Sequence, residues 1–393
     1  MKSFRLFPGR PPESVKNKVL INTMPLLAPL TGIGNYTLNL SKAFLALDQN
    51  SDYTFSYGFY YSKGLYSYNS NVFIRSLCKV KESLKKYHLF GVYGRKFKDL
   101  FPVLKRKEFD LYFEPNTIPA KVRAKKVVVT VCDLSFKKFP HYQPKDRAEY
   151  FNRHLDEGLK QSDRVIVLSE EIKNELIDMV GVRKEMINVI PAGIEGKIFK
   201  LYPKEEVESV RTKYSLPEKF ILYIGSIEPR KNLKGLLDAY LNLNVRKEYK
   251  LVVVGAEGWG NREVLQIFSK HSDDILFLGY LPNIDIALLM NAAFCLAYPS
   301  FYEGFGLPPL EAMACGCPTV VSKVSSIPEV CGDAAYYIDP YKVDSISEGI
   351  YKVLTDKPLR QDLVKKGFER VKRFSWEESA RKHMGVFKEV LNL

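Results

Sequence analysis

Residues 298–316 read Tyr-Pro-Ser-Phe-Tyr-Glu-Gly-Phe-Gly-Leu-Pro-Pro-Leu-Glu-Ala-Met-Ala-Cys-Gly and predict a strand, a glycine-rich loop and a helix in direct succession. The two adjacent prolines suit the first turn of the helix, where a missing N–H costs little. Gly316 suits the helix end, where a left-handed residue is favoured. Glu303 therefore lies in the loop and Glu311 in the early part of the helix.

The loop before this helix predicts an anion-binding site. The backbone amides of Phe305, Gly306 and Leu307 can point at a ligand, and the start of a helix favours negative charge. Phosphate alone would repel the two carboxylates nearby, so we interpret Glu303 and Glu311 as acceptors for hydroxyl groups of a ribose and a hexose. The alternative is a pair of solvated glutamates beside a capped helix.

A second motif, Ile-Gly-Ser-Ile-Glu-Pro-Arg-Lys-Asn-Leu at residues 224–233, places two cations after a buried strand. Gly225 begins the turn, and a helix is expected from about Asn232. Arg230 can bind a diphosphate with two parallel hydrogen bonds, and Lys231 acts as a point charge. Such a motif alone is more often a surface loop. Together with the glutamate loop two strands later, it predicts a diphosphate site.

The first half of the chain offers a glycine pair after a strand. Residues 31–35 read Thr-Gly-Ile-Gly-Asn, and the loop is expected to end at Gly34, with a helix over residues 35–47. Glycine allows the backbone to approach a ligand closely. A tight turn without a ligand explains this short motif equally well.

Asp133 follows a strand that is expected to be buried on both faces, because residues 127–131 are almost all β-branched. A carboxylate at that strand end faces the crevice beyond the sheet. It also suits a simple cap of the next turn, and the sequence leaves both roles open.

Strands alternate with helices along the whole chain, which predicts an α/β fold with parallel, doubly wound sheets. A charged stretch over residues 200–218, with Pro203 and Pro217, predicts a break between two Rossmann-like domains, residues 1–199 and 200–375. Residues 376–393 predict a terminal amphipathic helix. The expected strands are residues 18–22, 127–131, 164–168 and 189–190, then 220–224, 249–254, 275–278, 294–298 and 319–321.

Composition narrows the class of protein. A chain of 393 residues is long enough for two cores. The six cysteines form no CxxC pair and have no His-rich partner nearby, so no metal site is expected. No apolar run is long enough to cross a bilayer, and residues 1–19 hold no signal-peptide core. These features predict a cytoplasmic protein.

The net charge of +14 lies almost entirely in the first half. Residues 1–199 hold 33 Lys and Arg against 20 Asp and Glu, and residues 72–107 alone hold 11 against 2, interleaved with aromatic side chains. This segment suits an anionic membrane surface. The alternative is a solvated helical face with its aromatics inward. No nucleic-acid-binding module is present elsewhere, so nucleic acid is not expected as a partner.

The glutamate loop and the Glu-Pro-Arg-Lys-Asn motif closely resemble those of family-4 glycosyltransferases, which have the two-domain GT-B fold. The resemblance covers nearly the whole chain and includes Thr-Gly-Ile-Gly-Asn-Tyr at 31–36, Val-Ile-Pro-Ala-Gly-Ile at 189–194, Ser-Ser-Ile-Pro-Glu-Val at 325–330 and Phe-Ser-Trp-Glu at 374–377. The chain looks most like the enzymes that build bacterial O-antigen and capsular polysaccharides, which are often mannosyltransferases.

This resemblance implies two facing domains with the donor in the cleft, and a terminal helix that packs back on the first domain. It also implies a retaining, metal-free transfer of a hexose, mannose above all, from a nucleotide sugar such as GDP-mannose. The acceptor is then a lipid-linked glycan or oligosaccharide in lipopolysaccharide biosynthesis. The enzyme would be peripheral on the inner face of the cytoplasmic membrane. Oligomeric state, linkage and the identity of the donor are left open.

Carried over by position, the family pattern gives Arg230 and Lys231 the donor diphosphate, Glu311 the ribose and Glu303 the hexose. Residues 305–307 would line sugar and phosphates, Gly225 the turn beside them, and Gly34 would close from the other domain. Glu303, Asp133, Arg230 and Lys231 are the implied catalytic residues.

Cys132 departs from the family pattern. Many relatives have His-Asp-Leu where this chain has Cys132-Asp133-Leu134, and a thiol is a far poorer hydrogen-bond donor than a histidine. The thiol leaves one alternative open, a non-catalytic nucleotide-sugar-binding partner of a glycosyltransferase. A nucleotide-sugar epimerase is a second alternative, because epimerases share this architecture. A dinucleotide-dependent oxidoreductase is not expected, because the glycine pattern GxGxxG is missing.

Overall fold

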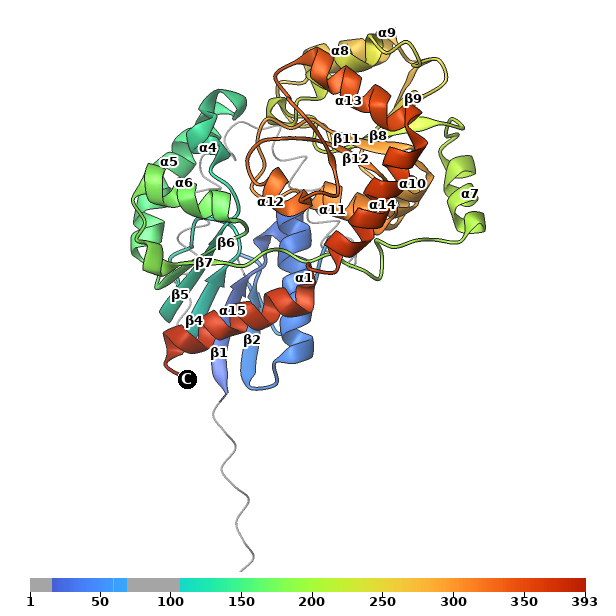
Figure 1. Cartoon of the computed structure of the whole chain (residues 1–393). Helices are drawn as coiled ribbons and strands as arrows, with labels where there is room; N and C mark the ends of the chain where they lie inside the picture. Colours follow the sequence, from blue (N-terminus) through green and yellow to red (C-terminus); the bar gives the residue numbers. More distant parts are fainter. Residues whose placement is uncertain (1–15, 59, 69–106) are drawn as a thin grey trace, which may run out of the picture.

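The first sheet has seven strands in the order β3-β2-β1-β4-β5-β6-β7 (Figure 1). The computed structural model describes residues 16–58, 60–68 and 107–393. All neighbouring strands in this sheet run parallel except β2 and β3. The strands are β1 (Asn17–Asn22), β2 (Ser51–Ser56), β3 (Tyr61–Ser62), β4 (Phe109–Glu114), β5 (Ala124–Val131), β6 (Arg164–Val167) and β7 (Ile187–Val189).

The second sheet is entirely parallel and has the order β10-β9-β8-β11-β12-β13. In both sheets the strand order reverses beside the first strand, as in doubly wound nucleotide-binding domains. The predicted fold class, two Rossmann-like α/β domains, is confirmed. The strands are β8 (Phe220–Ile224), β9 (Lys250–Val254), β10 (Ile275–Phe277), β11 (Cys295–Tyr298), β12 (Thr319–Ser322) and β13 (Tyr336–Ile338).

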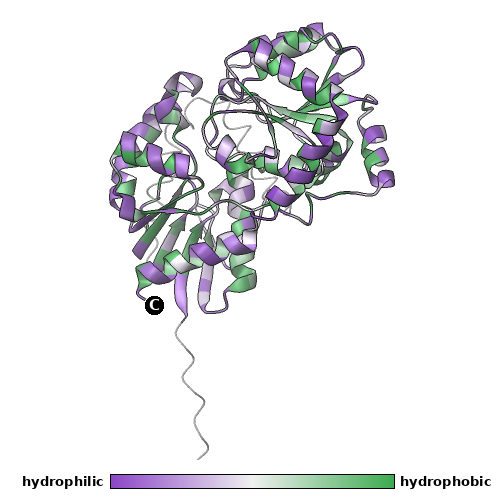
Figure 2. Cartoon of the chain, viewed as in Figure 1, coloured by the Kyte–Doolittle hydropathy of each residue, from purple (hydrophilic) through white to green (hydrophobic). Residues whose placement is uncertain are grey.

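Helices lie against both sheets and combine hydrophilic and hydrophobic residues along their length (Figure 2). Among the described residues, none of the helices is long and apolar enough to cross a membrane. The helices are α1 (Gly32–Leu47), α4 (Ser135–Lys138), α5 (Lys145–Lys160), α6 (Glu170–Val180), α7 (Lys204–Lys213), α8 (Leu233–Leu241), α9 (Arg262–Lys270), α10 (Asn283–Ala292), α11 (Leu307–Ala314), α12 (Ile327–Cys331), α13 (Val343–Thr355), α14 (Lys357–Val371) and α15 (Trp376–Leu391).

Two sequence expectations need correction. The loop expected through Gly34 is helical, because α1 begins at Gly32 with Thr31 as its N-cap. The expected break over residues 200–218 contains α7, which packs on α10. Tyr214, the residue that ends α7, donates a hydrogen bond of 2.8 Å from its hydroxyl to Asp285 on α10, so most of the charged stretch is a surface helix.

The last helix, α15, crosses the first sheet and packs on α1, β4 and β5 (Figure 1). Phe387 lies 5.4 Å from Phe44 and 5.3 Å from Phe113, measured between ring centroids. The chain thus passes between the two sheets twice. These two crossings lie side by side, since the Ile194 amide donates to the Phe374 carbonyl oxygen at 3.2 Å.

Candidate active site

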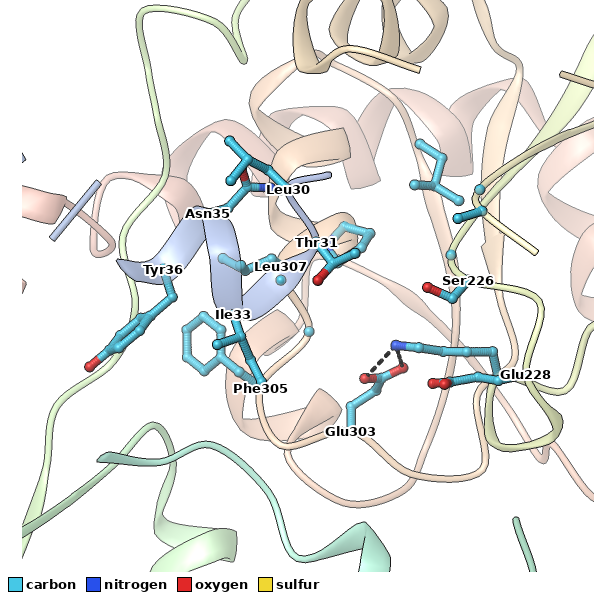
Figure 3. Close-up of a pocket in the computed structure, with 18 of the residues that line it drawn as sticks. Leu30, Thr31, Ile33, Asn35, Tyr36, Ser226, Glu228, Glu303, Phe305 and Leu307 are labelled. Atoms are coloured by element: carbon cyan, nitrogen blue, oxygen red, sulfur yellow. Dashed lines mark hydrogen bonds and ion pairs between the residues drawn. The ribbon is translucent and has the colours of Figure 1, made fainter. Parts of the chain in front are cut away.

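A cavity of about 440 Å³ lies between the two sheets, and the strand ends and loops around it supply its walls (Figure 3). The first domain contributes the start of α1 and the end of β5, and the second contributes the loops after β8, β9, β10 and β11. Ligands of doubly wound sheets bind beyond the carboxyl ends of the strands. The motifs found in the sequence therefore meet where this rule places a ligand.

Two cations and two carboxylates form a buried cluster on the second-domain wall. Lys231 donates from its Nζ to both Glu303 carboxylate oxygens, at 2.6 and 2.8 Å (Figure 3). Arg230 donates to Glu303 at 3.0 Å and to Glu228 at 2.8 Å. Tyr298 lies 3.0 Å from Lys231, measured between its hydroxyl and the Nζ. The predicted diphosphate cations and the predicted sugar carboxylate are thus in direct contact.

Neighbouring positive charges outweigh the effect of burial on the pKa of Glu303. Burial alone would raise the pKa of this carboxyl, but the neighbouring Lys231 and Arg230 lower it to about 2. Arg230 is 9% exposed, and its Nε is buried without a hydrogen-bond partner among the described residues. Glu303 is therefore ionised at neutral pH, and Arg230 holds one donor buried within the protein.

Glu311 stands apart from this cluster. It lies in the second turn of α11 on the cavity wall, and its carboxyl makes no hydrogen bond or ion pair with any described residue. Burial, with a smaller contribution from the negative charge of Glu195, raises its pKa to about 8. Glu311 therefore carries a proton at neutral pH, and its polar atoms are free for a ligand.

The starts of two helices face the cavity from opposite sides. α11 begins after Gly306, whose φ of 110° lies in the region that glycine tolerates best. α1 begins at Gly32 across the cleft, and both glycines line the cavity. Each helix start offers unpaired amides and partial positive charge, so the pair suits an anion such as a diphosphate. Phe305 and Leu307 also line the cavity, and their contact with the donor stays a prediction.

The glycines predicted to bind the donor differ in their placement. Gly225 lines the cavity after β8 and runs close to Gly255, where a Cβ would meet the Gly225 carbonyl oxygen at 1.9 Å. Gly34 is absent from the cavity wall, and a Cβ there would point at Leu30 and Pro25. Because α1 starts earlier than expected, Gly32 occupies the exposed position instead.

Cys132 and Asp133 form the part of the first-domain wall at the end of β5. The Asp133 carboxylate accepts hydrogen bonds from the Ser135 amide at 2.9 Å and the Ser135 hydroxyl at 2.7 Å, so it caps the next turn while lining the cavity. The Cys132 thiol points at the Pro115 carbonyl oxygen, 3.7 Å away. Burial raises the pKa of this thiol far above its usual range, so it stays protonated.

Several wall residues were given no role from the sequence. Glu228 was within reach, since it stands in the Glu-Pro-Arg-Lys-Asn motif two positions before Arg230, to which it binds. Trp259 follows the end of β9, where strand-end loops are expected to bind ligands. Arg147 comes from α5 of the other domain and lies 5.3 Å from the Trp259 ring, a contact that no local pattern announces.

No group of three or more His, Cys, Asp or Glu side chains with metal-binding geometry occurs in residues 16–58, 60–68 and 107–393. The expectation of a metal-free reaction stays a prediction.

Known proteins match both halves of the chain. Residues 30–196 match the family described as Glycosyltransferase Family 4, and residues 206–370 match Glycosyl transferases group 1. The chain is 32% identical over 388 residues to O-antigen chain mannosyltransferase B of Escherichia coli, an alignment that covers 94% of this chain and 99% of that protein.

Solved structures share the fold. Sucrose-phosphate synthase of Thermosynechococcus elongatus has a TM-score of 0.69 and 20% identity, with 96% of this chain and 99% of that chain covered. Anabaena HepE in complex with UDP-glucose has a TM-score of 0.70 and 16% identity, with 95% and 100% covered. With a full-length relative and matches over both sheets, the chain belongs to the family-4 glycosyltransferases of the GT-B fold.

Proposed function

We propose that this glycosyltransferase moves a hexose, mannose in particular, from a nucleoside diphosphate sugar to a lipid-linked glycan of a bacterial surface polysaccharide. The observation that carries the proposal is the Arg230–Lys231–Glu303 cluster, placed between two helix starts on opposite walls of one cavity. The choice of mannose and of O-antigen rests on the relative of 32% identity, an O-antigen chain mannosyltransferase.

The donor's charges match the cavity. Its diphosphate would share Arg230 and Lys231 with Glu303, and lie at the start of α11. Its ribose hydroxyls would bond to Glu311, and its hexose hydroxyls to Glu303. Cations and helix dipoles held in place beside a departing diphosphate stabilise the negative charge that grows on it in the transition state.

Glu303, the ionised carboxylate of the cluster, is already bound by two cations, so we assign it to sugar binding rather than to nucleophilic attack. In the reaction we propose, the acceptor hydroxyl attacks the anomeric carbon on the face that the diphosphate leaves. The bond from that carbon to the phosphate oxygen breaks, and the acceptor proton passes to this oxygen. The sugar keeps its anomeric configuration.

The test is a screen of nucleotide sugars by thermal shift, followed by transfer assays with the ligands that raise the melting temperature. We expect GDP-mannose to stabilise the protein, and NMR of the product to show the configuration of the donor. A product with inverted configuration would refute the retaining mechanism. Stabilisation only by another nucleotide sugar would refute the choice of donor.

A non-catalytic nucleotide-sugar-binding partner is the second candidate, and Cys132 in place of the usual histidine favours it. Such a protein would bind GDP-mannose yet neither transfer mannose nor slowly hydrolyse the donor. A hydrolysis assay without acceptor, run at saturating donor, separates the two candidates.

We also propose a peripheral location on the cytoplasmic membrane face. Its support is the basic segment at residues 72–107, which lies, apart from Lys107, outside the described residues. Each basic side chain near an anionic surface contributes about 1 kcal/mol. Wild type should sediment with anionic vesicles at low salt, and a variant with Lys79, Lys81, Lys85 and Lys86 changed to Glu should not. Equal binding of the two proteins would exclude this segment as the docking surface.

A further inference from the structure

Tyr302 belongs to the second domain by sequence and to the first domain by packing. It follows β11 in the glutamate loop, yet its side chain is 1% exposed within the core formed by β5, β6, α4, α5 and α6. Its ring lies 5.5 Å from that of Phe139, and the Lys138 ammonium lies 5.5 Å from its centroid. The second domain therefore inserts an aromatic side chain into the first.

The Tyr302 hydroxyl makes two hydrogen bonds inside the first domain. It donates to the Glu175 carboxylate at 2.5 Å and accepts from the Leu134 amide at 3.1 Å. Glu175 is 6% exposed and also accepts from Lys138 at 2.5 Å. Separating the domains removes this hydroxyl from both groups, which leaves the buried Leu134 amide without this partner and Glu175 with Lys138 alone.

Gly304, on the other side of Glu303, is also tied to the first domain. A Cβ at this position would lie 1.8 Å from the Cys132 carbonyl oxygen, so the two backbones touch. The Gly304 carbonyl oxygen accepts a hydrogen bond from the Ser169 hydroxyl at 3.1 Å. Glu303 is thus flanked in sequence by two residues that bind the opposite domain.

The backbone of Tyr302 reaches the cation cluster. Its carbonyl oxygen accepts from Arg230 at 2.6 Å, while the next residue, Glu303, accepts from Arg230 at 3.0 Å. A shift of Tyr302 that accompanies domain opening therefore moves two hydrogen-bond acceptors of Arg230 at once.

We propose that Tyr302 is a positioning residue that couples closure of the two domains to the placement of Glu303 and Arg230. When the Tyr302 hydroxyl is hydrogen-bonded to Glu175, the domains are closed and Arg230, Lys231 and Glu303 are in contact. When this hydrogen bond is lost, the loop that carries Tyr302 and Glu303 moves with the second domain away from the first. The effect on turnover rests on the proposed function, whereas the effect on domain closure does not.

The experiment compares Tyr302→Phe with Tyr240→Phe. Tyr240 is buried within the second domain, and its hydroxyl donates to the carbonyl oxygens of Arg246 and Asp274. The control therefore loses a buried, hydrogen-bonded hydroxyl away from the domain contact. Small-angle X-ray scattering without nucleotide should give a larger radius of gyration for Tyr302→Phe than for wild type and Tyr240→Phe. An unchanged radius would overturn the proposal whatever the activity.

Kinetics supply the second measurement. We expect kcat of Tyr302→Phe at saturating donor to fall about 10- to 100-fold, the cost of losing a hydrogen bond to a buried carboxylate. GDP affinity should fall less than kcat does, because Arg230 shifts with the loop while Lys231 and the start of α11 stay in place. A fall in GDP affinity as large as the fall in kcat would mean local damage to the cluster and would overturn coupling. If wild type itself transfers no sugar, the proposed function fails while the scattering result still decides on closure.

Two changes at Glu175 keep the test independent of folding defects at Tyr302. Glu175→Gln retains an acceptor for the hydroxyl and should stay near wild type in radius and kcat. Glu175→Ala removes the acceptor and should resemble Tyr302→Phe. Equal behaviour of the Gln and Ala variants would contradict the role of this hydrogen bond.

Discussion

At the scale of single residues, two glutamates of the site differ in their protonation state. Glu303 is ionised because two cations outweigh its burial. Glu311 is protonated because burial raises its pKa to about 8, with a smaller contribution from the charge of Glu195. One carboxylate accepts hydrogen bonds, and the other can also donate one. This difference suits a ligand that carries hydroxyl groups at both ends, such as a nucleotide sugar, because one end meets a pure acceptor and the other meets a group that can also donate.

Lys231→Ala should weaken GDP binding by about 1.5–3 kcal/mol, since it removes a charge-assisted donor beside the start of α11. Arg230→Ala should do the same. Lys234→Ala is the control, because that side chain pairs with Asp238 on α8 and does not line the cavity. Isothermal titration calorimetry measures the three affinities. Wild-type affinity in both cavity variants would refute the diphosphate assignment.

Glu311 predicts a pH dependence of stability. Its pKa is about 8 in the folded protein and 4.5 in the reference state, so the folded state holds this proton more tightly. The resulting stability is present below about pH 4.5 and is lost as pH rises to about 8. Glu311→Gln should therefore gain free energy of unfolding relative to wild type between pH 5 and 8.5. Urea titrations measure this, with exposed Glu348→Gln as control. A pH-independent difference would contradict the raised pKa.

The different roles assigned to Glu303 and Glu311 also predict different effects of their substitution on kcat and donor affinity. Glu303→Gln should lower kcat more than donor affinity, whereas Glu311→Gln should lower donor affinity more, because only Glu303 is assigned to the transferred sugar. Steady-state assays at saturating donor and acceptor separate the two. Undiminished turnover by Glu303→Gln would show that the cluster does not hold the hexose.

Cys132→His should raise the transfer rate or shift donor preference, with little loss of folding. The thiol lines the cavity beside Asp133 and makes only a long contact to Pro115, so an imidazole has a polar partner within reach. Thermal unfolding checks the fold, and a donor panel checks the activity. The same rate and donor profile in a folded variant would show that this position does not touch the sugar.

At the scale of elements, the sequence predicted those strands whose own residues are almost all apolar. Strands β5, β8, β9, β11 and β12 were found because they are nearly uninterrupted apolar runs, buried on both faces. β2 and β4 were missed because polar residues interrupt their pattern, although the side chains are buried. α7 was missed because a charged helix with one buried residue resembles a linker.

Contacts between residues far apart in the sequence could not be predicted from the sequence alone. Glu303 and Lys231 were both found, but their pairing depends on two adjacent parallel strands, β8 and β11, ending at the same edge. Nothing near Tyr302 signals that its side chain crosses to the other domain, since its partner Glu175 lies on a helix far earlier in the chain.

Helix α15 should be essential to the first domain. Phe387→Ala removes a buried ring that packs on Phe44 and Phe113, and should cost about 3–5 kcal/mol. Urea unfolding followed by fluorescence measures the loss. Tyr351→Ala on α13, where the side chain is 46% exposed, is the control and should change stability by less than about 0.5 kcal/mol. A loss no larger than the control's would show that α15 is dispensable.

At the scale of the whole molecule, the two sheets should unfold together. α15 completes the first domain from beyond the second, and Tyr302 joins both cores. Calorimetry should show one transition, and GDP should move all of it although the residues assigned to the nucleotide lie mostly in the second domain. Two transitions, of which GDP moves only one, would show independent domains.

The position of α15 also has a consequence for how the chain folds while the ribosome synthesises it. The first sheet leaves the ribosome before the entire second domain is translated, and only then does α15 emerge to cover β4 and β5. At about 5–20 residues per second, the nascent first domain waits on the order of ten seconds or more with Phe44 and Phe113 uncovered. Ribosome-stalled chains ending before Trp376 should therefore stay protease-sensitive and bind chaperones, and chains that expose the whole helix should not.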